Sequence, residues 1–313
     1  MPRTLSAPVT VAFDYTRSTG PVLGRFLTGL RDGTLVGGRT SDGKVVVPPP
    51  EYDPVTHQAV TDFVEVAPTG QGSPTDEARW VDAWTRAAGD VHTLVCERLE
   101  AAWPGDAEPP GAALAHAVLA ALPPGASLFV GSSNSARDVE TARGPRGPQV
   151  LANRGLAGID GCLSTAVGLA LARPGVPTYA LVGDLTFVHD ANALVIGPGE
   201  PVPDLTIVVA DDRGGGIFAT LEYGDPARRA LDPAGYERVF ATPTGTDLGA
   251  LAAAHGVPSA RVTSRRELRE ALTERPRGLR VVHVPIRRDS RRADDTALRV
   301  AVAEGVSIEP GNG

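Results

Sequence analysis

Cysteine is nearly missing from this sequence, which has two, Cys96 and Cys162, in 313 residues. Two isolated cysteines match neither a disulfide framework nor the paired spacing of a zinc site. We therefore expect a cytoplasmic protein with reduced thiols. Long apolar runs are also missing, since none approaches the ~20 residues that cross a bilayer, and the N-terminus lacks the layout of a signal peptide.

An excess of positive charge is lacking as well. The chain carries 30 Lys and Arg against 37 Asp and Glu, which leaves a net charge of −7. This balance argues against a protein that binds nucleic acid or a membrane surface. Hydrophobic residues, in contrast, make up 42% of the chain. That fraction is enough for a sizeable core, and the length suggests two domains, although one large domain would also fit.

The character of the sequence changes near residue 70. Before this point, short β-branched runs are separated by Gly, Asp and Pro, which is typical of a small β structure. These runs are Val9–Tyr15, Thr34–Thr40 and Lys44–Pro49. Residues 71–121 are predicted to be a linker and helices. One helix is expected from Glu77 to about Trp103 with a break near Gly89, and a second over Ala112–Leu122.

After Leu122, expected strands and helices alternate strictly up to about Arg287. The strands are predicted at Ser127–Gly131, Gln149–Asn153, Thr178–Asp184, Asp204–Asp212, Ser259–Thr263 and Gly278–Ile286. Strands with no polar face, alternating with helices, indicate an α/β fold with a doubly wound parallel sheet covered on both sides. Residues 288–313 are expected to form a tail, and the basic run Arg287–Arg292 to be solvated.

The ends of four predicted strands carry unusual residues, and ligands of parallel sheets bind at the carboxyl ends of the strands. These ends are Gly131–Ser135, Asn153–Gly155, Gly183–Thr186 and Asp211–Phe218. Small residues at such turns let backbone N–H groups approach an anion. Asp184 and Asp212 would repel a bare phosphate, but a bound Mg²⁺ would reconcile them with one.

A plainer interpretation exists for each of these features taken singly. An Asp after a strand is often only a helix N-cap, and three consecutive glycines are often only a flexible turn. Two acidic turns on neighbouring strands, 28 residues apart, favour a site for a metal and a diphosphate.

Four motifs in order carry a family resemblance: GSSNSARD, NRGLAGIDGCLSTAVGLA, GDLTFVHDANAL and RGGGIF. Together they resemble the 2-succinyl-5-enolpyruvyl-6-hydroxy-3-cyclohexene-1-carboxylate synthases of menaquinone biosynthesis, which are thiamine diphosphate enzymes. The resemblance runs from roughly Pro74 to the C-terminal region. It implies a transferase that uses thiamine diphosphate and Mg²⁺, decarboxylates 2-oxoglutarate and adds the resulting unit to isochorismate.

The resemblance assigns roles to individual residues. Asp184 and Asp212 match Mg²⁺ ligands, with the Gly214 carbonyl as the third, and the family usually has Asn in place of Asp212. Ser133, Arg137 and Arg154 match residues that handle substrate carboxylates, for which guanidinium groups are suited. An alternative for Arg137 is a solvated helix arginine. The other matches lie along the cofactor and substrate pocket: Ile159, Gly183, Leu185, Thr186, Gly216, Ile217, Phe218 and Leu221.

The resemblance also implies that part of the enzyme is missing. Thiamine diphosphate enzymes pair two domains of this type across a dimer interface, and the second domain supplies a glutamate that activates the cofactor. This chain has room for only one such domain, at residues 122–287, with a remnant of the middle domain before it. We therefore expect no activating glutamate here, and a homo-oligomer or a partner chain that carries the missing domain.

Residues 1–70 resemble a different family. The motifs YTRSTGPV, FLTGL and VPPPEYDPVT are similar to the N-terminal part of OB-fold, zinc-ribbon-like proteins that accompany acyl-CoA thiolases. This segment has no cysteine, so no zinc is implied. We interpret the chain as a fusion of two partial genes.

Two alternatives to the synthase remain open. One is a non-catalytic accessory protein of an acyl-CoA or thiolase complex. The other is a thiamine diphosphate decarboxylase or carboligase of the acetolactate type, against which Arg137 and Arg154 argue, because such enzymes handle less anionic acceptors.

Overall fold

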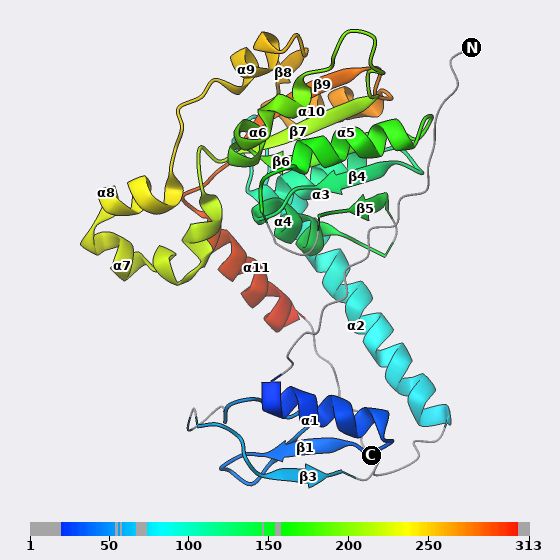
Figure 1. The fold of residues 1–313 in the computed structure, drawn as a ribbon, viewed down its shortest axis with the longest axis vertical. Coiled ribbons are helices and arrows are strands. Elements are labelled where there is room, and N and C mark those ends of the chain that lie inside the picture. Colours follow the sequence, from blue (N-terminus) through cyan, green and yellow to red (C-terminus); the bar gives the residue numbers. More distant parts are fainter. Residues whose placement is uncertain are drawn as a thin grey trace. The chain divides into compact units, whose positions relative to one another are not determined.

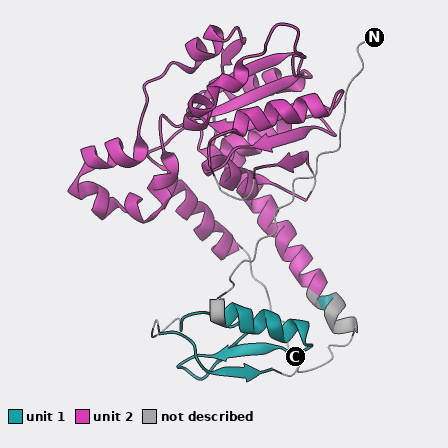
Figure 2. Ribbon diagram, in the orientation of Figure 1, with its two compact units in different colours: residues 1–80 teal, residues 81–313 magenta. Residues whose placement is uncertain are grey.

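The computed structural model describes residues 20–53, 56, 58–66, 74–145, 147–153 and 158–305. The chain divides into two compact units, residues 1–80 and 81–313 (Figure 2). Each unit has a sheet of its own, with three strands in the first and six in the second. Within the described residues, no helix combines the length and the apolar character that crossing a membrane requires.

In the described part of the first unit, helix α1 (Gly20–Arg31) accompanies a small antiparallel sheet. Its strands are β1 (Val36–Arg39), β2 (Val45–Val46) and β3 (Phe63–Glu65), in the order β2-β1-β3. Two of the three predicted β runs therefore form strands, while Val9–Tyr15 lies outside the described residues.

Helix α1 (Gly20–Arg31) was not predicted, because glycines interrupt its apolar pattern and Gly is a poor helix former. Gly29 has a packing role there. A Cβ at this position would lie 2.9 Å from Cγ2 of Val36, so the glycine lets α1 approach β1 closely.

The second unit contains a six-stranded parallel sheet in the order β5-β4-β6-β7-β9-β8 (Figure 1). Its strands are β4 (Ser127–Val130), β5 (Gln149–Leu151), β6 (Thr178–Gly183), β7 (Leu205–Asp211), β8 (Ser259–Arg261) and β9 (Leu279–Pro285). Every pairing in it is parallel. The predicted α/β fold is confirmed.

Helices cover both faces of this sheet. They are α3 (Gly111–Ala121), α4 (Asn134–Ala142), α5 (Cys162–Ala172), α6 (Asp184–His189), α9 (Leu248–Ala254) and α10 (Arg265–Thr273). Successive strand residues point to opposite faces, so Leu181 belongs to one core cluster and Val182 to the other. This explains why the strands read as continuous apolar runs.

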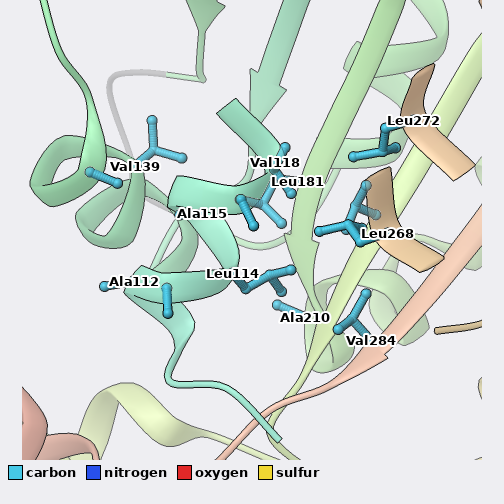
Figure 3. Close-up of a cluster of buried hydrophobic side chains, with 14 of the residues drawn as sticks. Ala112, Leu114, Ala115, Val118, Val139, Leu181, Ala210, Leu268, Leu272 and Val284 are labelled. Atoms are coloured by element: carbon cyan, nitrogen blue, oxygen red, sulfur yellow. The ribbon is translucent and has the colours of Figure 1, made fainter. Parts of the chain in front are cut away.

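One of these clusters lies between the sheet and α3, α4 and α10 (Figure 3). Leu268 and Leu272, one turn apart on α10, are both fully buried against it. The start of α10 is closed by a capping box. The Ser264 hydroxyl accepts a hydrogen bond from Glu267 N (3.2 Å), and the Glu267 carboxylate accepts one from Thr263 N (2.9 Å).

The long helix α2 (Pro74–Ala101) runs through Gly89 without interruption, so the predicted break is wrong. A single glycine costs a helix only about 1 kcal/mol, and that cost is easily met by a 28-residue helix that packs Val95 and Leu99 into the core. Trp103, just beyond its end, is 3% exposed.

The basic run Arg287–Arg292 is not a solvated tail, and that prediction is wrong. Helix α11 (Arg291–Gly305) follows β9, and Arg291 at its start is 6% exposed. Its Nη1 and Nη2 donate to the two carboxylate oxygens of Asp138 at 3.1 and 2.6 Å. The partner lies 153 residues away, so a local charge pattern could not reveal the pair.

Strand order places a crevice at one edge of the sheet. From β4 the chain first goes to β5 on one side and then to β6 on the other. Such a switch point leaves the carboxyl ends of two adjacent strands without a crossing connection, and open α/β sheets bind ligands there. Here these ends are Gly131 and Gly183, where two of the four sequence motifs begin.

The buried pair of Asp138 and Arg291 makes a testable contribution to stability. We expect Asp138→Ala to lower the free energy of unfolding by about 3–5 kcal/mol, because it leaves the buried guanidinium with only the more distant Asp295 carboxylate, at 4.0 Å. Urea denaturation measures this loss. The control is Glu270→Ala, which breaks an exposed ion pair with Arg266 and should change stability by less than about 0.5 kcal/mol. Equal effects of the two substitutions would contradict the account.

Candidate functional site

A cavity of about 370 Å³ opens at the carboxyl edge of the parallel sheet. Its walls come from the turn before α4, the junction of β6 and α6, and the loop after β7. It brings together every predicted site residue that the structure describes: Ser133, Arg137, Ile159, Gly183, Asp184, Leu185, Thr186, Asp212, Gly214, Gly216, Ile217, Phe218 and Leu221. Arg154 lies outside the described residues.

Asp184 lies where buried strand β6 meets helix α6. The N-cap of α6 is Gly183, and no side chain caps this helix end. Asp184 is therefore the first helical residue, so the interpretation of this acid as an N-cap does not hold. Its side chain is 7% exposed, and Gly214 of the loop after β7 lines the same cavity.

Asp212 directly follows the neighbouring strand β7 and is 6% exposed. Burial, and then the charges of Asp212 and Asp211, raise the pKa of Asp184 to about 8. Burial also raises the pKa of Asp212 to about 6, against the opposing effect of Arg291 and Arg288. Two carboxyl groups that share a buried site cannot both ionise at low cost, so the site favours protons or a cation.

The glycine-rich loop after β7 approaches these carboxylates closely. Gly214 has a φ of +144°, which side-chain-bearing residues rarely adopt, and a Cβ there would strike the Ala241 carbonyl. A Cβ on Gly216 would collide with the Asp212 carboxylate. The glycines are therefore required by the geometry, and the interpretation of GGG as a merely flexible turn does not hold.

Asn134 is a site residue that the sequence analysis missed. It begins α4, lines the cavity, and its Oδ1 is buried without a hydrogen-bond partner in the described structure. The preceding Ser133 has a φ of 75°, a left-handed conformation that is costly for a residue with a Cβ. Buried polar atoms normally find partners, so the unpaired Oδ1 points to a ligand. The motif GSSNSARD contained Asn134, but nothing in its spacing distinguished this residue from its neighbours.

Arg137 lies one turn along α4 and is exposed, as the alternative interpretation of a solvated arginine expected. Its Nη1 donates to the Ser133 carbonyl at 2.9 Å, so the side chain folds back onto the turn at the mouth of the cavity. It also lines the cavity. Arg137 is therefore an exposed residue that also lines the cavity, and its role in binding a substrate carboxylate stays a prediction.

The apolar side of the cavity comes from a short 3₁₀ helix, Gly216–Thr220. Its residues Ile217 and Phe218 line the cavity. The Phe218 ring packs against Phe240 with centroids 5.5 Å apart. Leu221, which follows this helix, is 39% exposed at the rim. The cavity thus has two sides of different character. We call Asp184 and Asp212 its acidic floor, and Ile217, Phe218 and Leu221 its apolar wall.

The donor set of the acidic floor suits a magnesium ion bound to a phosphate. Among the described residues, no three His, Cys, Asp or Glu side chains gather as metal ligands. Mg²⁺ does not need such a cage, because it keeps several waters and is bound through one or two carboxylates plus substrate phosphates. Asp184 and Asp212 supply the carboxylates, and backbone carbonyls such as that of Gly214 are oxygen ligands of the same kind.

Comparison with known proteins agrees with this geometry. Residues 130–284 match the family model described as thiamine pyrophosphate enzyme, C-terminal TPP binding domain. Proteins named 2-succinyl-5-enolpyruvyl-6-hydroxy-3-cyclohexene-1-carboxylate synthase are similar to 76% of this chain. The one from Saccharopolyspora erythraea is 48% identical over 242 residues, and the one from Kineococcus radiotolerans is 46% identical over 239.

Solved structures include a thiamine diphosphate-dependent 4-hydroxybenzoylformate decarboxylase from Rhodococcus jostii. It is 19% identical, with a TM-score of 0.47, and the match covers 60% of this chain and 34% of that one. The chain spans 41% of the length of each of the two synthases. Residues 130–284 of this chain therefore match the C-terminal TPP binding domain of the thiamine pyrophosphate enzymes.

Proposed function

We propose that this chain is the diphosphate-binding part of a synthase that decarboxylates 2-oxoglutarate and joins the product to isochorismate. The observation that carries the proposal is the pair of buried carboxylates, Asp184 and Asp212, at one sheet edge beside a glycine-rich loop. The identity of 48% with a synthase of that name supports the choice of reaction.

In this proposal, Asp184, Asp212 and the Gly214 carbonyl hold Mg²⁺ against the diphosphate of the cofactor. Asp212 stands where the family usually has Asn, and the additional carboxylate strengthens the attraction for the cation. Asn134 Oδ1, buried without a partner, would accept a hydrogen bond from the bound group or its water. The start of α6 lines the same cavity, and a helix N-terminus favours an anion.

Thiamine diphosphate, when bound, supplies the electron sink that a decarboxylation needs. The residues of this chain orient it and exclude water. Ile217, Phe218 and Leu221 form the apolar wall, and Ile159 lines the same cavity. Ser133, Arg137 and Arg154 would take the substrate carboxylates, because both proposed substrates are polyanions and guanidinium groups pair with carboxylates.

The proposal includes a second domain. Activation of the cofactor requires a glutamate that the family places on the other domain of a pair, and we expect this glutamate to lie outside residues 122–287. We therefore propose a homo-oligomer or a partner chain as the source of that domain, with residues 122–287 as the cofactor-binding domain. Residues 1–70 would be a separate segment fused to it.

Cofactor binding gives the first test of this function. Thermal unfolding of the full chain should show a Tm increase of roughly 5 °C when thiamine diphosphate and Mg²⁺ are present at about a hundredfold excess over Kd. Asp184→Ala should abolish the increase, because it removes one of the two cation ligands.

Glu200, an exposed acid outside the cavity, offers the matched control. Glu200→Ala should keep the full Tm increase. A wild-type chain that the cofactor does not stabilise, or an Asp184→Ala variant that it stabilises equally, would be incompatible with the proposed function.

The raised pKa values generate a second test, on the ligand-free protein. Asp184 and Asp212 have pKa values of about 8 and about 6 in the folded state, against 3.8 as the reference. Protons on these groups therefore stabilise the fold fully below about pH 4, and this stabilisation is lost as the pH rises through the two folded-state values.

Asp184→Asn should consequently make the ligand-free chain more stable at pH 8, by about 1–3 kcal/mol, and change its stability little at pH 4. Urea denaturation at the two pH values measures the difference. A variant that is less stable than wild type at pH 8 would show that the two carboxylates do not repel each other in the folded state.

A further inference from the structure

The C-terminal basic run contacts the loop that follows β7 at two places that no motif suggested. Arg288 lies in the segment between β9 and α11, and Arg292 lies in the first turn of α11. The two residues reach consecutive parts of the loop that follows β7. We call Arg288 and Arg292 the arginine clasp.

Arg292 caps the C-terminal end of the 3₁₀ helix that carries the apolar wall. Its Nε donates to the Ala219 carbonyl at 2.9 Å, and its Nη2 donates to the Leu221 carbonyl at 2.7 Å. These carbonyls lie at the C-terminal end of the 3₁₀ helix Gly216–Thr220, where backbone acceptors lack helical partners. A cation at a helix C-terminus is also favoured by the helix dipole.

Arg288 acts on the preceding part of the same loop. Its Nη1 donates to the Arg213 carbonyl at 3.3 Å, and its Nη2 donates to Glu237 at 2.8 Å. The Arg213 peptide leads directly into Gly214. Arg288 therefore ties the glycine-rich loop to the segment that carries Phe240, the ring against which Phe218 packs.

A loop with three consecutive glycines needs such external contacts. Glycine has the largest backbone freedom of any residue, so ordering Gly214–Gly216 carries a high entropic cost. The clasp supplies fixed donors from a rigid base, because Arg291 between them is anchored in the core through Asp138. The position of the loop after β7 is thereby set by α11 and the segment before it, which contribute no predicted site residue.

We propose that Arg288 and Arg292 are positioning residues of the cofactor pocket, which hold the glycine-rich loop and the apolar wall in the geometry that receives the cofactor. This inference rests on the proposed function for the identity of the ligand. Its structural part, the ordering of residues 213–221 by the clasp, can be tested without any ligand.

The first measurement is amide hydrogen exchange on the full, ligand-free chain. Arg292→Ala should raise exchange in residues 216–224 by at least about tenfold, because two charge-assisted hydrogen bonds are lost, while α5 keeps wild-type protection. Arg299→Ala, at an exposed position of the same helix, is the matched control and should change neither segment. Unchanged exchange at residues 216–224 in Arg292→Ala would overturn the proposal.

The second measurement separates positioning from general damage to the fold. With Mg²⁺ present, Arg292→Ala should weaken thiamine diphosphate binding about tenfold in calorimetry, since the apolar wall is displaced. Inorganic pyrophosphate, which needs only the acidic floor, should bind within about twofold of wild type. Arg292→Lys should lie between wild type and Arg292→Ala, because an ammonium lacks the fork that spans two carbonyls.

Equal weakening of both ligands by Arg292→Ala would indicate a structural role only and would overturn the positioning role. Failure of the proposed function has a different signature. In that case the wild-type chain binds neither ligand, and hydrogen exchange alone decides whether the clasp orders the loop.

Discussion

The repulsion between two buried carboxylates is the constraint on which the rest of this structure depends. Asp184 and Asp212 follow adjacent parallel strands and are both more than nine-tenths buried. Such an arrangement lowers the stability of the ligand-free fold at neutral pH, and bound protons or a cation offset this cost. The glycines beside Asp212, the left-handed Ser133 and the unpaired Asn134 oxygen surround the same point. Together these features support the proposal of a site for a metal-bound diphosphate.

Much of this site could be predicted because its residues lie at strand ends. A parallel sheet brings the ends of sequence-distant strands to one edge, so the acids at 184 and 212 had to meet if the strands were neighbours. The alternation of apolar runs and helices predicted those strands with small errors at their ends. Asn134 could not be distinguished in the same way, because its role depends on burial and on the absence of a partner, which no spacing encodes.

The C-terminal segment Arg287–Arg292, in contrast, could not be predicted from the sequence. Six residues with four arginines read as a solvated run, yet three of these arginines pair with groups 51 to 153 residues earlier in the chain. Charge in a sequence indicates solvent exposure only when no buried partner exists, and Asp138 is such a partner. The segment that looked like a tail also contacts the loop after β7, which forms part of the proposed cofactor pocket.

We propose that the cavity binds a diphosphate and that catalysis depends on another domain. The central claim of this proposal is that the two carboxylates act through a cation, and pyrophosphate binding tests this most directly. Calorimetry should show that Mg²⁺ tightens pyrophosphate binding by the wild-type chain at least about tenfold, because without the cation the carboxylates repel the ligand. Equal affinity with and without Mg²⁺ would contradict the claim.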